Sequence, residues 1–138
     1  MVILESQTHQ RAIQKLRKKK AYSSIDDDLQ EFFDNHEFDE IWEMRFFLRG
    51  NGGVRLLKLR IKNRNQTRGT SAGYRLIARC QSDNKEVCLL YVYPKIGPHA
   101  QINIDDNFEV KLLKKYKEQL LDNSLVYSEL NQAENEKV

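Results

Sequence analysis

The sequence predicts an α+β fold: a small β-sheet, mostly antiparallel, packs against two N-terminal helices and carries a C-terminal helix. Three observations indicate this fold. Strand patterns cluster in residues 54–95, helix patterns lie on either side of that stretch, and polar turns separate the strands. The chain has 138 residues, of which 40% are hydrophobic and 31% are charged, and this suits a globular domain with a core of its own.

Three strands are expected, at residues 54–62, 73–80 and 86–93. Side chains alternate between the two faces of a strand. In the first strand one face is therefore apolar, with Leu57, Leu59 and Ile61, and the other is basic, with Lys58, Arg60 and Lys62. The second strand places Arg75, Ile77 and Arg79 on one face. The third strand is apolar almost throughout, which is typical of a strand covered on both faces.

The N-terminal part is expected to form a strand at residues 2–4, at or next to a sheet edge, and helices at residues 8–19 and 24–35. Ser24 and Asp27 resemble a capping box at the start of the second helix. The first helix is rich in basic residues, which fit either a second nucleic-acid contact or a solvated face. Residues 36–53 fit either an extra strand paired with residues 54–62 or a short helix and a loop. Trp42 is expected to anchor the core.

A C-terminal helix is expected at residues 107–121, capped by Asp105 or Asp106. Its inward residues should be Val110, Leu113, Tyr116 and Leu120. The domain is expected to span residues 1–125, and residues 126–138 should form a polar, acidic tail that frays.

The composition narrows the class of protein further. No apolar run approaches the ~20 residues of a membrane span, and the N-terminal segment lacks the pattern of a signal peptide. We therefore expect a cytoplasmic protein without membrane contact. Cys80 and Cys88 flank a polar turn, could lie opposite one another, and are expected to be buried thiols. Neither cysteine has other ligand residues beside it in sequence, so no metal or cofactor is expected.

The charge distribution indicates a polyanionic partner. Residues 44–82 contain ten basic residues and no acidic residue, whereas the rest of the chain holds 13 basic and 20 acidic residues. The net charge of +3 therefore conceals a strongly basic sheet region within an acidic frame. Surfaces of a single sign attract polyanions and raise the rate at which they are encountered.

The order of three motifs resembles a known family. The motifs, separated by a basic loop and a turn, are Lys58-Leu59-Arg60-Ile61, Gly73-Tyr74-Arg75-Leu76-Ile77 and Leu89-Leu90-Tyr91-Val92-Tyr93-Pro94-Lys95. This arrangement resembles the RelE/HigB toxins, the toxin halves of bacterial toxin–antitoxin pairs. The resemblance covers most of residues 1–120 and rests on order and spacing.

The resemblance implies a ribosome-dependent endoribonuclease that cuts mRNA without a metal, by attack of a ribose 2′-hydroxyl on the adjacent phosphate. Arg75 matches the family arginine that contacts the scissile phosphate, and Lys95 matches a basic residue that assists the leaving group. Clustered like charges depress a lysine's pKa, so Lys58 or Lys62 could act as a base. The remaining expected RNA-binding residues are Arg60, Arg64, Arg68 and Arg79.

The general base is open at this point. Some family members use a tyrosine beyond the last basic residue, but residues 96–102 contain no tyrosine and instead contain His99. Histidine titrates near neutral pH, so His99 is a candidate base, although it could equally be a loop histidine with no catalytic task. Tyr93 could stack on a base or take part in proton transfer, or belong to the core.

Two other functions fit the same fold. The ParE branch of the superfamily inhibits DNA gyrase by binding, and a non-catalytic RNA-binding module would also use a basic sheet face. The resemblance further implies two partners: a cognate antitoxin that covers the basic face, and the ribosome with its mRNA.

Overall fold

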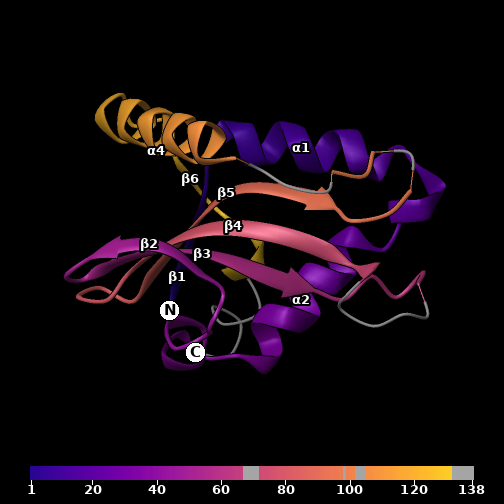
Figure 1. Cartoon of the computed structure of the whole chain (residues 1–138), viewed down its shortest axis with the longest axis horizontal. Helices are drawn as coiled ribbons and strands as arrows, with labels where there is room; N and C mark the ends of the chain where they lie inside the picture. The colour runs from indigo at the N-terminus through magenta and orange to yellow at the C-terminus, as the bar shows by residue number, and fades with distance from the viewer. Residues whose placement is uncertain (67–71, 98, 102–104, 132–138) are drawn as a thin grey trace.

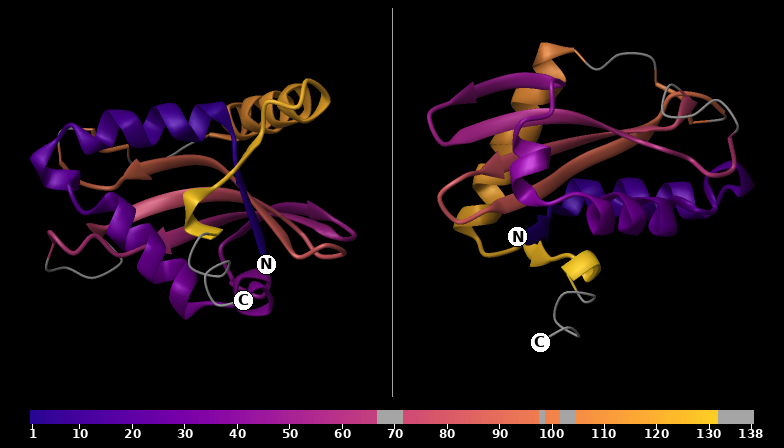
Figure 2. Two further views of the ribbon diagram at one scale, coloured as in Figure 1. Left: turned by 180° about the vertical axis from the view of Figure 1, so that it is seen from behind. Right: turned by 90° about the horizontal axis from the view of Figure 1, so that it is seen from below.

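The computed structural model describes residues 1–66, 72–97, 99–101 and 105–131, which form a six-stranded sheet with helices on both faces (Figures 1 and 2). The strands are β1 (Val2–Glu5), β2 (Phe47–Asn51), β3 (Val54–Ile61), β4 (Tyr74–Gln81), β5 (Glu86–Pro94) and β6 (Val126–Tyr127). The helices are α1 (Gln7–Arg17), α2 (Ile25–Asn35), α3 (Phe38–Trp42) and α4 (Asp106–Leu121), with 3-10 turns at Lys20–Tyr22 and Glu129–Asn131.

The sheet order β2-β3-β4-β5-β1-β6 confirms the predicted α+β class. Strands β2 to β5 pair antiparallel, and β1 lies parallel to β5, one position from the edge. The edge strand is β6, which pairs with Leu4 and Glu5 of β1. Its two residues, Val126 and Tyr127, thus belong to the sheet, although the sequence assigned them to the C-terminal tail. Residues 132–138 of that predicted tail lie outside the described part of the chain.

The first face of the sheet is covered by α1, α2 and α3 and holds the larger core (Figure 2). The predicted apolar face of β3 is confirmed, because its three residues are fully buried here together with alternate residues of β4. The helices contribute Ile13, Leu16, Leu29, Phe33 and Ile41.

The second face is covered by α4 over part of its area, as Figure 1 shows from that side. Leu112 and Tyr116 of α4 pack against β4 and β5, but Val110 and Leu120 are 51% and 50% exposed, so their predicted inward orientation is wrong. The buried stripe also includes two polar residues, which a hydrophobic pattern could not reveal. Glu109 accepts a hydrogen bond from Arg49 at 3.2 Å and Gln119 accepts one from the backbone of Gln7 at 2.9 Å.

The helix starts differ in how well the sequence predicted them. Asp105 caps α4 by accepting a hydrogen bond from the Phe108 backbone N–H at 2.9 Å, as expected. The capping box at Ser24 is wrong. The Ser24 side chain makes no cap bond, and its hydroxyl donates instead to Asp28 at 2.6 Å. Asp28 therefore joins a polar junction between α2 and the chain that follows β3.

Residues 36–53 contain both structures that the sequence left as alternatives: the short helix α3 and the strand β2, which pairs with the first half of β3. Trp42 lies at the margin of the larger core, with the Arg55 guanidinium 4.3 Å from its ring centre. Within the described ranges, no helix combines the length and apolar composition needed to cross a bilayer.

The two cysteines are buried thiols, as expected, and burial raises the pKa of each to about 12. They do not lie opposite one another. Cys80 pairs with Val87 and faces the larger core, whereas Cys88 faces α4.

Gly73 marks a close approach of two chain segments, because a Cβ atom there would overlap the backbone carbonyl oxygen of Ile61. We expect Gly73→Ala to lower the free energy of unfolding by about 1–3 kcal/mol, as overpacking does, in a denaturant titration. Gly53→Ala is the matched control, since its Cβ would meet only the Ser82 hydroxyl, at 3.1 Å. Equal losses in the two variants would contradict the steric argument.

Candidate active site

The register of β3, β4 and β5 places cationic and aromatic residues in rows across the second face of the sheet. Arg60 pairs with Arg75, which in turn pairs with Tyr93. In the next row Lys58 pairs with Ile77, which pairs with Tyr91. Alternation in β3 and β4, together with the positions of Ile77 and Tyr93 in the α4-side core, assigns these rows to the second face.

A β-bulge in β5 brings the two tyrosines to this face. Ala78 pairs with Leu89 whereas Ile77 pairs with Tyr91, so Leu90 is the extra residue. Strict alternation would have turned Tyr91 and Tyr93 toward the larger core together with Leu89. Because of the bulge, Val92 takes that inward position instead. Bulges often re-aim side chains next to active sites.

Lys95 joins these rows through the backbone. Its N–H donates to the Gly73 carbonyl at 3.0 Å, which fixes Lys95 beside the start of β4. Burial lowers the pKa of Lys95, and the charges of Arg75, Lys58 and Arg60 lower it further. Among the described groups, those that shift this pKa by charge are all cations. We call Lys58, Arg60, Arg75 and Lys95 the cationic cluster.

Arg75 lies at the centre of the cationic cluster and is only 6% exposed. Its Nη1 donates to the Tyr74 carbonyl at 3.1 Å. Burial lowers the pKa of Arg75, the Arg60 charge lowers it further, and Tyr93 acts in the opposite direction. The Tyr93 hydroxyl is itself buried, and burial raises its pKa. Tyr93 therefore belongs both to the core and to the wall of the site.

Arg79 is on the same strand face as Arg75, but the structure does not bring it into the cationic cluster. Its Nη1 donates to the Tyr116 hydroxyl at 3.0 Å and to Gln81 at 2.9 Å, and its guanidinium lies 4.4 Å from the Tyr116 ring centre. Arg79 thus binds α4 to the sheet. The boundary of the open surface falls between Arg75 and Arg79.

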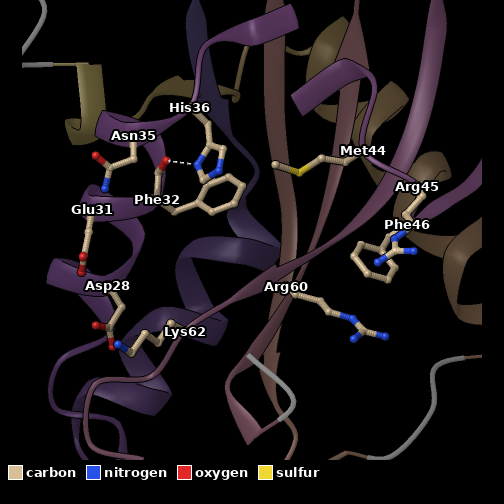
Figure 3. Close-up of a pocket in the computed structure, with 10 residues that line it drawn as sticks. All are labelled: Asp28, Glu31, Phe32, Asn35, His36, Met44, Arg45, Phe46, Arg60 and Lys62. Atoms are coloured by element: carbon tan, nitrogen blue, oxygen red, sulfur yellow. Dashed lines mark hydrogen bonds between the residues drawn. The ribbon is translucent and has the colours of Figure 1, made fainter. Parts of the chain in front are cut away.

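Arg64 and Lys62 also lie apart from the cationic cluster. The Arg64 Nε donates to Asp28 at 2.8 Å and its Nη2 to Glu31 at 3.1 Å, so that the side chain joins the chain after β3 to α2. Lys62 follows the end of β3, and Figure 3 shows its amine directed toward Asp28. Arg68, the other expected RNA-binding residue of this loop, lies outside the described residues.

Arg60 reaches a second cavity, of about 560 Å³, between α2 and the segment before β2 (Figure 3). Its guanidinium lies 4.1 Å from the ring centre of Phe46. Cation–π contact of this kind holds an exposed arginine in one orientation. Sequence reasoning missed this role of Phe46, because its contact with Arg60 depends on where β2 begins.

His99 lies on the other side of β5 from Arg60. Its backbone N–H donates to the Tyr22 hydroxyl at 3.0 Å, and its ring centre is 6.1 Å from that of Tyr22. It lines a groove with Tyr93 and with residues of α1. The structure thus places His99 next to the site but not in the rows of the cationic cluster.

Comparisons with protein-family models, with curated proteins and with solved structures found no match to this chain. The site therefore has to be interpreted from its own geometry. That geometry is a set of four cations beside two tyrosines, on the part of a sheet face that α4 leaves uncovered.

Proposed function

We propose that this chain is the toxin of a toxin–antitoxin pair, a ribosome-dependent endoribonuclease that cleaves mRNA. The observation that carries the proposal is the cationic cluster, in which a partly buried lysine with a lowered pKa lies beside a buried arginine. Cleavage of RNA needs cations for the phosphorane charge and a proton donor for the leaving oxygen. The cationic cluster offers both types of group within one surface.

In the proposed reaction the 2′-oxygen forms a bond to phosphorus while the bond from phosphorus to the 5′-oxygen breaks. Arg75 and Arg60 stabilise the charge on the phosphorane oxygens. Lys95 gives its proton to the leaving 5′-oxygen, for which a lowered pKa is favourable. Lys58 is the remaining amine of the cationic cluster, and we assign it the proton of the 2′-hydroxyl. The products are a 2′,3′-cyclic phosphate and a 5′-hydroxyl.

The product ends test this function directly. In a translating extract supplied with a labelled mRNA, we expect discrete cuts whose upstream fragments carry cyclic phosphate and whose downstream fragments carry 5′-hydroxyl groups. The same mRNA without ribosomes is the control and should remain whole. Binding of RNA with steep salt dependence but without such ends would support a non-catalytic RNA-binding module. Loss of gyrase supercoiling with intact mRNA would support the gyrase-inhibitor alternative.

Two partners belong to this proposal. A cognate antitoxin would place acidic groups against the cationic cluster and so compete with RNA. On the ribosome, basic residues outside the cluster would contact rRNA. Growth arrest on expression, relieved by the antitoxin, is the cellular outcome that the proposal expects.

A further inference from the structure

A groove runs along the edge of β5 that faces away from β4. Strand β1 accompanies β5 only as far as Leu89, so residues 91–94 of β5 have no neighbouring strand on that side. Helices α1 and α4 form the walls of the groove, whose volume is about 350 Å³. Small-molecule sites in proteins have volumes of about 300–1,000 Å³, so the groove has room for a compact ligand.

The side chains of the groove select for an anion with a planar group. Arg11 and Lys15 come from α1 and Lys115 comes from α4, and no acidic residue of the described chain lines the groove. Tyr91 and Tyr93 supply aromatic surface, with their ring centres 6.0 Å apart. Phosphate contacts from lysine and arginine combined with stacking on tyrosine are the usual means of binding single-stranded nucleic acid.

The groove is continuous with the cationic cluster through β5. Tyr93 lines the groove and pairs with Arg75 of the cluster, and Tyr91 lies beside it in the next row. A strand of RNA whose phosphate lay at Arg75 would therefore pass the two tyrosines as it left the cluster. We propose that this groove binds the nucleotide next to the cleaved linkage, with its phosphate at Lys15 and Lys115 and its base at Tyr91. The assignment rests on the function proposed above.

Two buried polar atoms of the groove residues support a ligand there. The Tyr93 hydroxyl and the His99 Nε2 have no hydrogen-bond partner among the residues that the structure describes. Tyr93 is only 1% exposed, and a buried polar group without a partner destabilises the folded state. A ribose hydroxyl or phosphate oxygen that reached either atom would supply the missing hydrogen bond.

A protein partner fits the groove less well than RNA. A peptide that added itself as a strand to the open edge of β5 would need the backbone groups of residues 91–94. The Pro94 carbonyl already accepts a hydrogen bond from the Gln101 backbone at 3.0 Å. The exposed aromatic and cationic side chains, rather than the backbone, are therefore the binding groups that the groove offers.

The test uses the full chain and a fluorescent single-stranded RNA whose 2′-oxygens are methylated, so that binding is measured without cleavage. The groove variant is Lys15→Ala with Lys115→Ala. Its matched control is Lys18→Ala with Lys114→Ala, which removes the same charge from the same two helices outside the groove. We expect the groove variant to weaken binding about tenfold and the control less than twofold. The salt dependence should also fall, by roughly 0.7 in log K per lost phosphate contact on single strands.

The base contact has a separate readout. Tyr91→Leu should weaken binding fivefold or more, whereas Tyr91→Phe, which keeps the ring, should remain within twofold of the unchanged protein. Equal weakening in the groove and control variants would overturn the proposal, as would displacement of the RNA by poly-glutamate of equal charge. Cleavage of unmodified mRNA is scored separately. Absent cleavage with groove-dependent binding would refute the enzyme but retain the groove as an RNA site.

Discussion

Replacing Lys95 by alanine is expected to reduce mRNA cleavage by about 100-fold or more, because a positioned proton donor typically contributes 10²–10⁴-fold to a rate. The side chain is only partly buried and its backbone hydrogen bond to Gly73 does not depend on it, so the fold should remain. Initial rates in a translating extract measure the effect. Lys111→Ala, which removes an exposed lysine from α4, is the control and should keep the full rate.

The pH dependence of the rate identifies the role of Lys95. Because burial and three cations lower its pKa, we expect cleavage to decline as the pH rises through that lowered value and the ammonium loses its proton. Lys95→Arg keeps the positive charge but does not titrate in this range. It should bind RNA normally, cleave slowly and lose that decline. An unchanged profile in Lys95→Arg would exclude Lys95 as the proton donor.

Arg75 has a matched control on its own strand. Arg75→Gln should reduce cleavage about 100-fold, the usual cost of losing one group that stabilises the transition state. Arg79→Gln removes an equivalent charge two residues away, but from a side chain that holds α4. Arg79→Gln should therefore lower the melting temperature while the rate per folded molecule stays near normal. Comparable loss of rate in both variants would show that the active surface extends beneath α4.

The second large effect concerns stability at low pH, and it originates at His9. The ring is fully buried, and burial lowers the pKa of His9 from about 6.5 to about 3, with a further lowering by Arg17. Below pH 6.5 the unfolded chain binds a proton that the folded chain excludes, so the free energy of unfolding must fall as the pH falls from 6.5 toward 3. At about 1.4 kcal/mol per pKa unit, the loss by pH 4.5 is about 2–3 kcal/mol.

Replacing His9 removes this proton uptake. We expect His9→Leu to flatten the loss of stability between pH 6.5 and pH 4.5 in denaturant titrations, whereas His36→Leu, at a partly exposed histidine, should leave the slope unchanged. Glu5 contributes with the opposite sign, since burial raises its pKa and its Oε2 lies 3.8 Å from His9 Nε2. Its contribution appears below pH 6.5 as well, so a slope that survives in His9→Leu would contradict the assignment to His9.

The sequence predicted the basic face of β3 because a period of two fixes which side chains share a face. It could not predict how much of that face α4 would cover, and so it grouped Arg79 with Arg75. It also grouped Arg64 with the RNA-binding residues, although Asp28 of α2, distant in sequence, pairs with it. The stripe of α4 was displaced for a similar reason: Glu109 and Gln119 are buried with hydrogen-bond partners that a single-sequence pattern does not contain.

The position of the candidate site depended on a feature that periodicity hides. Tyr91 and Tyr93 read as inward residues of β5 under strict alternation, and the bulge at Leu90 reverses their direction. Lys95 was expected at the site on the family resemblance, and the hydrogen bond to Gly73 places it beside Arg75. Gly73 and the basic residues were visible in the sequence, but the extra residue that aligns the two tyrosines with them was not.

The bulge at Leu90 divides β5 into two working lengths. Residues before it face cores on both sides of the sheet, where a change of shape is costly, and residues after it line surfaces that a ligand can reach. Variation in the second length can therefore alter what the protein recognises without passing through the interior. A single inserted residue gives this strand a conserved-shape anchor and an adjustable end, and new specificity should arise first downstream of it.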